Sequence, residues 1–273
     1  MASFSFSFPA TVRALEGLGP WTTTGVRGLL AGLLAGGCLF AARVPVPARR
    51  DRTALLTVAG GCVVGFPLLT TLALQTSTTA HSAVVIGMLP LATAACSAVL
   101  TGRRPSRAFW TAAGAGALAV FAFTLSRSRG LPGTADLYLF GALLLCAAGY
   151  AQGGRLAARM PGWQVIAWGC VAALPVSVLV TALALPHEPV RLTVQSATGM
   201  AYLAAVAQFG GFVVWYRGMA VVGVARASQI QLAQPLLTLI WSVLFMGEHL
   251  APLAPVTAVI VLACIAVTQR ART

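Results

Sequence analysis

The stretch PLATAACSAVLTG at residues 90–102 recurs as PLLTLIWSVLFMG at residues 235–247. Both copies read P-L-x-T-x-x-x-S-x-x-x-x-G, which gives five identities in thirteen ungapped positions at a shift of 145 residues. Upstream of this motif, Gly65 aligns with Gly210 at the same shift. Self-similarity at a fixed spacing indicates a structural repeat. The sequence therefore predicts that the chain is built from two related halves.

The composition shows which solvent surrounds these halves. The chain has 273 residues, of which 58% are hydrophobic and 8% are charged, and its mean hydropathy is +0.87. A soluble domain carries roughly a quarter charged residues, so we expect a membrane protein. The net charge of +13 comes from arginine, since the chain has no lysine. Because the arginines lie in short loops between apolar runs, they favour membrane orientation rather than a nucleic-acid partner.

Nine apolar runs have about the length of a membrane-spanning helix. They are continuous and do not alternate with polar residues, which favours helices over the strands of a barrel. We expect helices over 23–42, 54–74, 80–100, 108–125, 137–153, 163–185, 198–216, 222–246 and 251–268.

The repeat sets the topology of these helices. Each copy holds five helices, and an odd number turns the second copy upside down in the membrane, as in many secondary transporters. The predicted fold class is therefore an all-α integral membrane protein of two inverted five-helix repeats, which together form a ten-helix bundle. We assign residues 1–125 to the first repeat, residues 126–136 to a linker and residues 137–269 to the second, inverted repeat.

The start of the chain is short for this plan. Residues 1–12 align with residues 143–154, which form only the last part of the predicted helix 137–153. We therefore expect a truncated first helix and about nine full spans in this chain. Either the start codon lies further upstream or the chain is truncated.

The arginines also orient the bundle. Most of them fall on one side of the predicted helices, including Arg43, Arg49, Arg50 and Arg52. By the positive-inside rule that side is cytoplasmic, and the C-terminus lies there as well. The absence of lysine and the many Ala, Val, Leu and Gly residues are typical of a GC-rich bacterial genome. We therefore expect a multi-pass protein of the bacterial inner membrane.

The two five-helix halves, the prolines of the repeated motif and the segment GEHLAP at residues 247–252 resemble the EamA family of the drug/metabolite transporter superfamily. The resemblance covers nearly the whole chain. It implies a ten-helix bundle with a central cavity that exports or exchanges amino acids, other small metabolites or drugs. The sequence departs from the family in its short first helix, and in Arg103, which replaces the acid usual after the first motif.

The residues point to a candidate site where the two motif prolines lie. Pro90 and Pro235 each remove one N–H from the middle of a predicted helix and free the carbonyl four residues earlier. Such freed groups tend to face protein or a wet cavity, and paired helix breaks in two halves point to a site at the midplane. A kink that serves only packing is the alternative interpretation.

Polar side chains accompany the second proline. Gln231, Gln234 and Thr238 share one helix face, and Gln208 lies in the middle of the preceding predicted span. We expect these four residues to bind substrate. Hydrogen bonding between helices is the equally weighted alternative.

Two basic side chains occupy equivalent positions of the repeat, at the start of each proline-containing helix. His81 and Arg226 are candidates for attracting an anionic group of a substrate. Interfacial side chains that reach the lipid headgroups are the simpler interpretation. His81 is also the best candidate for a proton-linked step, because no Asp or Glu falls in the middle of a predicted span.

Together these features predict a secondary transporter, an exporter or exchanger, that moves small organic solutes by alternating access. No motif of the sequence indicates catalytic residues, a metal site or a cofactor. An intramembrane enzyme and a non-transporting partner or sensor subunit are the alternatives. Gly28, Gly32 and Gly36 form a double G-x-x-x-G, which we expect to pack helices within one bundle. A homodimer face is the second possibility.

Overall fold

The computed structural model describes residues 1–102, 106–127, 133–222, 233–248 and 252–270. Every regular element in these ranges is a helix, which agrees with the all-α prediction. The one contact of β type in the same ranges is an isolated bridge between Leu18 and Val190.

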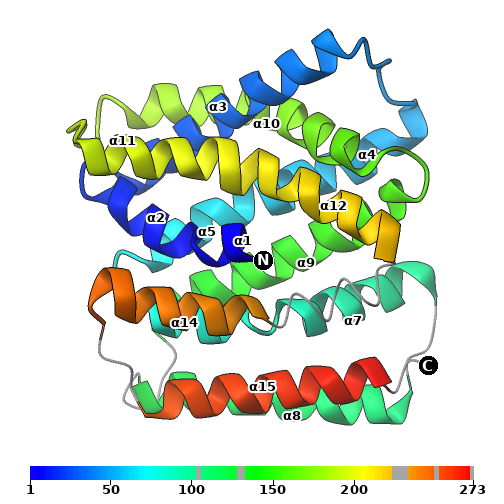
Figure 1. The fold of residues 1–273 in the computed structure, drawn as a ribbon, viewed down its shortest axis with the longest axis vertical. Coiled ribbons are helices and arrows are strands. Elements are labelled where there is room, and N and C mark those ends of the chain that lie inside the picture. The colour runs from blue at the N-terminus through cyan, green and yellow to red at the C-terminus, as the bar shows by residue number, and fades with distance from the viewer. Residues whose placement is uncertain (103–105, 128–132, 223–232, 249–251, 271–273) are drawn as a thin grey trace.

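Among the described residues, the elements that precede residue 128 are eight α-helices and one π-helix (Figure 1). They are α1 (Ala2–Ser5), α2 (Ser7–Leu15), α3 (Pro20–Ala41), α4 (Arg49–Val58), η1 (Ala59–Gly65), α5 (Phe66–Ala73), α6 (Thr79–Ile86), α7 (Leu89–Thr101) and α8 (Arg107–Arg127). The elements that follow are α9 (Thr134–Ala157), α10 (Gly162–Ala184), α11 (Val194–Ala201), η2 (Tyr202–Gly210), α12 (Gly211–Val222), α14 (Ala233–Met246) and α15 (Leu253–Arg270).

Six helical segments of the described residues are long and apolar enough to cross a membrane. They are Pro20–Ala41, Arg49–Ala73, Thr79–Leu100, Thr134–Ala157, Gly162–Ala184 and Val194–Gly218. Shorter apolar helices cover Trp110–Phe123, Ala233–Met246 and Leu253–Cys264. Each of the nine predicted runs overlaps one of these helices, although the first part of the run 222–246 lies outside the described residues.

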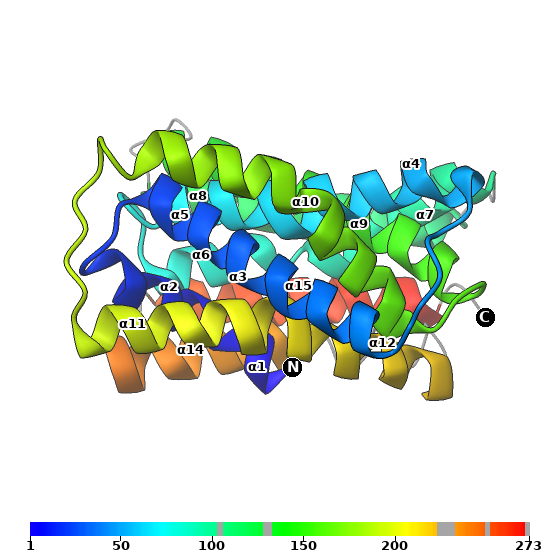
Figure 2. The ribbon, with the colours of Figure 1, turned by 90° about the horizontal axis from the view of Figure 1, so that it is seen from above.

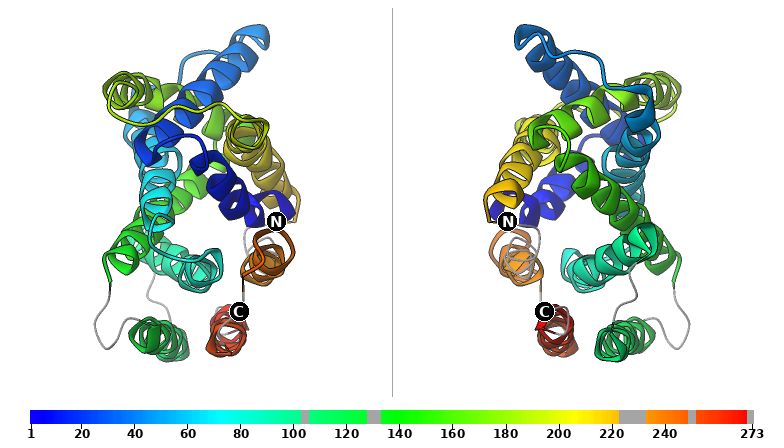
Figure 3. Two further views of the ribbon diagram at one scale, coloured as in Figure 1. Left: turned by 90° about the vertical axis from the view of Figure 1, so that its left-hand side faces the viewer. Right: turned by 90° about the vertical axis from the view of Figure 1, so that its right-hand side faces the viewer.

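The helices run along a common direction (Figure 2). In the end views, α3 and α10 lie at one edge of the bundle and α8 and α15 at the opposite edge (Figure 3). The remaining helices fill the space between these two pairs. Within each pair the two helices are in direct contact, α3 with α10 and α8 with α15. This arrangement places α6, α7, α14 and the short α1 and α2 near the middle of the bundle.

Glycines allow α3 and α10 to approach closely. A Cβ atom added at Gly28 would lie 2.3 Å from Ser177 Oγ, and one at Gly32 would lie 2.4 Å from Leu174 Cδ2. Small residues let helix backbones meet in this way. Gly28 and Gly32 therefore pack within the bundle, which confirms the first expectation for these two positions.

Two of the long apolar segments change their winding at their centres. The segment that starts with α4 passes through η1 before α5, and the segment that starts with α11 passes through η2 before α12. The sequence analysis did not predict these π-helical turns. Such turns shift the backbone hydrogen bonds from i→i+4 to i→i+5, and they occur frequently at functional sites.

Carboxylates from distant segments bind the first turns of two helices. Glu188 accepts hydrogen bonds from the N–H groups of Trp21 (3.2 Å) and Thr22 (2.7 Å) at the start of α3. Glu248 accepts from the N–H groups of Thr79 (2.8 Å) and Ala80 (2.9 Å) at the start of α6. The first N–H groups of a helix have no partner within the helix and favour negative charge, so these contacts stabilise both helix ends.

Candidate functional site

The structure brings the two motif prolines together. Pro90 is the second residue of α7, and the apolar segment is interrupted between Ile86, where α6 ends, and Leu89, where α7 begins. Pro235 is the third residue of α14. A Cβ atom added at Gly87, within the interruption, would lie 3.4 Å from Pro235 Cβ. The interrupted helix of the first half thus contacts the proline of the second half.

A small cavity lies where these elements meet. Its lining includes Phe8, Pro90, Gln234, Pro235 and Thr238. The cavity measures about 10 Å³, which is the space needed by about one water molecule. In this conformation the cavity therefore cannot hold an organic solute, and the helices around it must separate to admit one.

Thr238 connects α14 to the start of the chain. Its hydroxyl donates to the carbonyl of Ser5 (3.1 Å) and to the carbonyl of Gln234 (3.0 Å). Trp241 Nε1 donates to Ser5 Oγ at 2.9 Å. The hydroxyl of Thr238 is thus engaged by backbone carbonyls, whereas the half-buried side chain of Gln234 lines the cavity.

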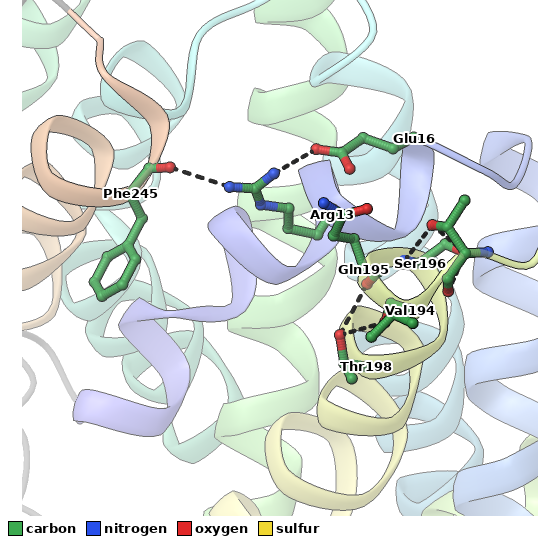
Figure 4. A network of polar contacts seen from close by, with 8 residues as sticks. Arg13, Glu16, Val194, Gln195, Ser196, Thr198 and Phe245 are labelled. Atoms are coloured by element: carbon green, nitrogen blue, oxygen red, sulfur yellow. Dashed lines mark hydrogen bonds and ion pairs between the residues drawn. The ribbon is translucent and has the colours of Figure 1, made fainter.

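Arg13 makes a second connection between α2 and α14 at one end of the bundle. Figure 4 shows its guanidinium between Glu16 and the carbonyl of Phe245. Nη1 lies 2.9 Å from Glu16 Oε1, and Nη2 donates to the Phe245 carbonyl at 3.5 Å. A cation near the last carbonyls of a helix is favourable, so Arg13 stabilises the contact between the two helices.

His81 is paired with a carboxylate that the sequence analysis placed in a loop. His81 Nε2 lies 2.6 Å from Asp136 Oδ1, and both side chains are buried. Asp136 Oδ2 accepts from the N–H of Gly133 at 2.8 Å. The imidazole also stacks on Phe123 at a centroid distance of 5.2 Å. In this conformation His81 is paired with Asp136, which is an anion of the protein itself. A second carboxylate, Glu248, accepts hydrogen bonds from the start of the same helix.

A larger pocket of about 400 Å³ opens beside this pair. Its lining consists of Thr76, Ser77, Thr78, His81, Gly133, Thr134, Ala135 and Asp136. The hydroxyls and the His81–Asp136 pair give this pocket polar groups along its lining.

The His81–Asp136 contact gives a testable coupling. Replacing Asp136 by Asn removes a charged acceptor from both His81 and Gly133, and we expect a loss of about 1–3 kcal/mol in the free energy of unfolding. His81→Gln should cost less in the Asp136→Asn background than in the wild type, since paired residues are not additive. Unfolding of the two single variants and the double variant in detergent measures this coupling. Additive effects would show that the two side chains do not interact.

Gln208 lies at the centre of a buried polar network. It is fully buried in η2, where its Oε1 accepts from Arg27 Nε at 3.0 Å and its Nε2 donates to the carbonyl of Cys62 at 3.2 Å. Arg27 belongs to α3 and Cys62 to η1. The amide therefore joins three segments, which fits the hydrogen-bonding alternative for this residue.

The sequence analysis did not single out Arg27. The residue lies seven positions after Pro20, within α3, and is only 7% exposed. The available signal was an ionisable residue inside an apolar run, which is costly in a membrane unless it faces the interior of the bundle.

Arg226 and Gln231 lie in residues 223–232, outside the described part of the chain. In the described part, no three His, Cys, Asp or Glu side chains gather closely enough to hold a metal ion.

Comparisons with known proteins identify the family of this chain. The EamA-like transporter family matches residues 1–125 and 133–269. This chain belongs to the EamA-like transporter family. A curated relative, an uncharacterized transporter named YdeK from Bacillus subtilis (strain 168), is 39% identical over 267 residues, which cover 98% of this chain and 93% of the relative.

A solved crystal structure also shares the fold. It superposes with a TM-score of 0.64 at 19% identity and covers 97% of this chain and 92% of its own. The chain is therefore a multi-pass membrane transporter, because it belongs to the EamA-like family and has several apolar helices. Its named relative is a bacterial transporter. The family is one of transporters rather than of enzymes.

Proposed function

We propose that the chain is a secondary transporter that exports or exchanges small organic solutes, such as amino-acid-like metabolites or drugs, by alternating access. Alternating access requires two bodies that rock about a site between them. The cavity that Gly87 and Pro90 line together with Gln234 and Pro235, across the two matched segments of the chain, carries this proposal.

Equivalent packing on both sides supports the proposed inverted repeats, residues 1–125 and 137–269 joined by the linker 126–136. The helix α9 packs against α4, η1, α5 and α7. Its counterpart in the alignment, α2, packs against α11, η2 and α14, which are the counterparts of α4, η1 and α7. Such exchanged packing is expected when two related halves face each other.

Equivalent backbone features support the same proposal. The π-helix η1 ends at Gly65 and η2 ends at Gly210, which are aligned positions of the repeat. The motif glycines Gly102 and Gly247 both have left-handed backbones, with φ values of 66° and 63°. Left-handed glycines commonly end helices, so the two motifs end in the same way.

The charges at the two ends of the bundle support the proposed orientation. Arg50, Arg155 and Arg159 line one pocket with Asp51, at the end where α3 and α9 finish. Glu188, Glu248 and Asp136 lie at the starts of α3, α6 and α9, which form the opposite end. By the positive-inside rule the arginine-bearing end faces the cytoplasm of a bacterial inner membrane, with the C-terminus on that side.

Within this proposal the solute binds between the two proline-containing helices. Gln234 and Thr238 provide polar contacts there, Pro90 and Pro235 provide the helix breaks, and Gln208 lies deeper in the bundle. Gln231 and Arg226 are proposed for the same path on their sequence positions. His81 is proposed to carry a proton-linked step, with Asp136 as its partner.

Efflux from whole cells tests the proposal. A bacterium that lacks its own exporters is loaded with a panel of labelled amino acids and toxic analogues, and we expect this chain to lower the retention of at least one solute. Gln234→Ala should reduce that efflux roughly tenfold, since one lost hydrogen bond of about 1.4 kcal/mol changes affinity by that factor. Gln195→Ala, at an exposed position, is the control. Unchanged efflux in a membrane-inserted Gln234→Ala variant would remove Gln234 from the site.

A further inference from the structure

Arg27 is a buried cation that forms no ion pair with any residue that the structure describes. The chain has five acidic residues, and all five have other partners. Glu16 pairs with Arg13, Asp51 with Arg50 and Arg159, and Asp136 with His81, while Glu188 and Glu248 accept backbone N–H groups at helix starts. Buried charges are normally paired, so an anion is the partner that this guanidinium would favour.

The hydrogen bond that Arg27 makes through Nε leaves its two Nη groups available to a ligand. Its Nε donates to Gln208 Oε1 at 3.0 Å, and among the described residues Nη1 and Nη2 have no hydrogen-bond partner. The two Nη groups form the planar fork that matches the two oxygens of a carboxylate. Gln208, held in turn by the Cys62 carbonyl, fixes the orientation of this fork.

A second unsatisfied group lies on the same face of α3. Thr23 precedes Arg27 by one helical turn, is 1% exposed, and its hydroxyl has no hydrogen-bond partner in the described part of the chain. A buried hydroxyl is normally hydrogen-bonded, often to the carbonyl one turn earlier. Thr23 can therefore supply a further hydrogen bond to an anion held by Arg27.

The depth of Arg27 excludes a lipid headgroup as that anion. The residue lies about 10 Å along the helix from Pro20. Its partners Gln208 and Cys62 lie near the middle of the segments 194–222 and 49–73. Sites at this depth, between elements of both halves, are where transporters hold their solutes. A single positive charge also matches a monoanion rather than a doubly charged phosphate.

We propose that Arg27 and Thr23 bind the carboxylate of the transported solute and that Gln208 is the positioning residue for Arg27. This inference rests on the proposed transport function and names its substrate class, which is small organic solutes that carry one carboxylate. An uncharged solute would leave the buried guanidinium without a counter-ion.

Binding of matched probes to the purified full chain tests the proposal without a known substrate. Acetate and benzoate are the carboxylate probes, and acetamide and benzamide are their uncharged counterparts, all at equal ionic strength. We expect the carboxylates, and not the amides, to raise the thermal unfolding midpoint of the wild type. Arg27→Gln should abolish the rise, Arg27→Lys should retain part of it, and Thr23→Val should weaken carboxylate affinity roughly tenfold.

The stability of the protein without any probe distinguishes a ligand site from a charge that stabilises the fold. Without any carboxylate, Arg27→Gln should unfold at a midpoint no lower than the wild type, because it removes an uncompensated buried charge. Should this variant not fold, Arg27→Lys and Thr23→Val still decide the result.

Three outcomes would overturn the proposal. The first is that the amides raise the thermal unfolding midpoint as much as the carboxylates do. The second is that the carboxylates raise the midpoint of Arg27→Gln as much as that of the wild type. The third is that neither carboxylate raises the midpoint of the wild type. A carboxylate shift without solute flux in vesicles would instead contradict the transport function alone. Flux of uncharged solutes without any carboxylate effect would contradict only this inference.

Discussion

Replacing Gln208 by Leu should lower the free energy of unfolding by about 3 kcal/mol or more. Leucine has a similar volume, so the variant leaves no large cavity. It removes the acceptor of Arg27 Nε and the donor to the Cys62 carbonyl. A buried guanidinium that loses its hydrogen bond carries the full cost of desolvation.

The double variant Arg27→Met/Gln208→Leu separates this cause from simple loss of packing. Replacing both partners by apolar side chains removes the unsatisfied charge, so the double variant should be more stable than Gln208→Leu alone. Unfolding titrations in mixed micelles measure both variants, with Gln195→Leu as an exposed control. A double variant that is less stable than Gln208→Leu would show that the loss does not arise from the buried charge.

Replacing Gly61 by Ala should also destabilise the protein strongly. A Cβ atom at Gly61 would lie 2.3 Å from the backbone oxygen of Leu145 and 3.3 Å from the Cα of Gly149, so η1 and α9 would have to separate. Overpacking of this kind costs about 1–3 kcal/mol, and a backbone obstacle cannot move aside as a side chain can.

The neighbouring glycine provides a matched control. A Cβ atom at Gly60 meets nothing within 4 Å. Gly60→Ala should therefore be neutral, or stabilising by about 0.5–1 kcal/mol through the unfolded chain. Thermal unfolding in detergent and the yield of inserted protein compare the two variants. Equal midpoints would mean that η1 and α9 are not in contact at this position.

The sequence predicts the helices well because a membrane imposes one strong requirement. Backbone polar groups in lipid must be satisfied within the segment, so a long apolar run has to be helical. The overlap of runs such as 163–185 with α10 follows from this requirement. The family resemblance was correct for the same reason, since it rested on the pattern of apolar runs and on the repeated motif.

The polar contacts inside the bundle could not be predicted in the same way. Asp136 was assigned to a loop, and its pairing with His81 joins residues that are 55 positions apart. The hydrogen bond of Arg27 to Gln208 could not be predicted, because periodicity gives the position of a residue along a helix but does not identify the neighbouring helices. The close approach of η1 to α9 at Gly61 and Gly149 likewise joins segments that are distant in the sequence.

Solute flux through reconstituted vesicles tests the central claim most directly. The full chain is inserted into liposomes loaded with unlabelled solute, and labelled solute outside is then followed over time. The account predicts counterflow of at least one small organic solute, lost in Gln234→Ala and retained in Gln195→Ala. Vesicles that contain folded, correctly inserted protein and show no flux of any solute above protein-free liposomes would contradict it.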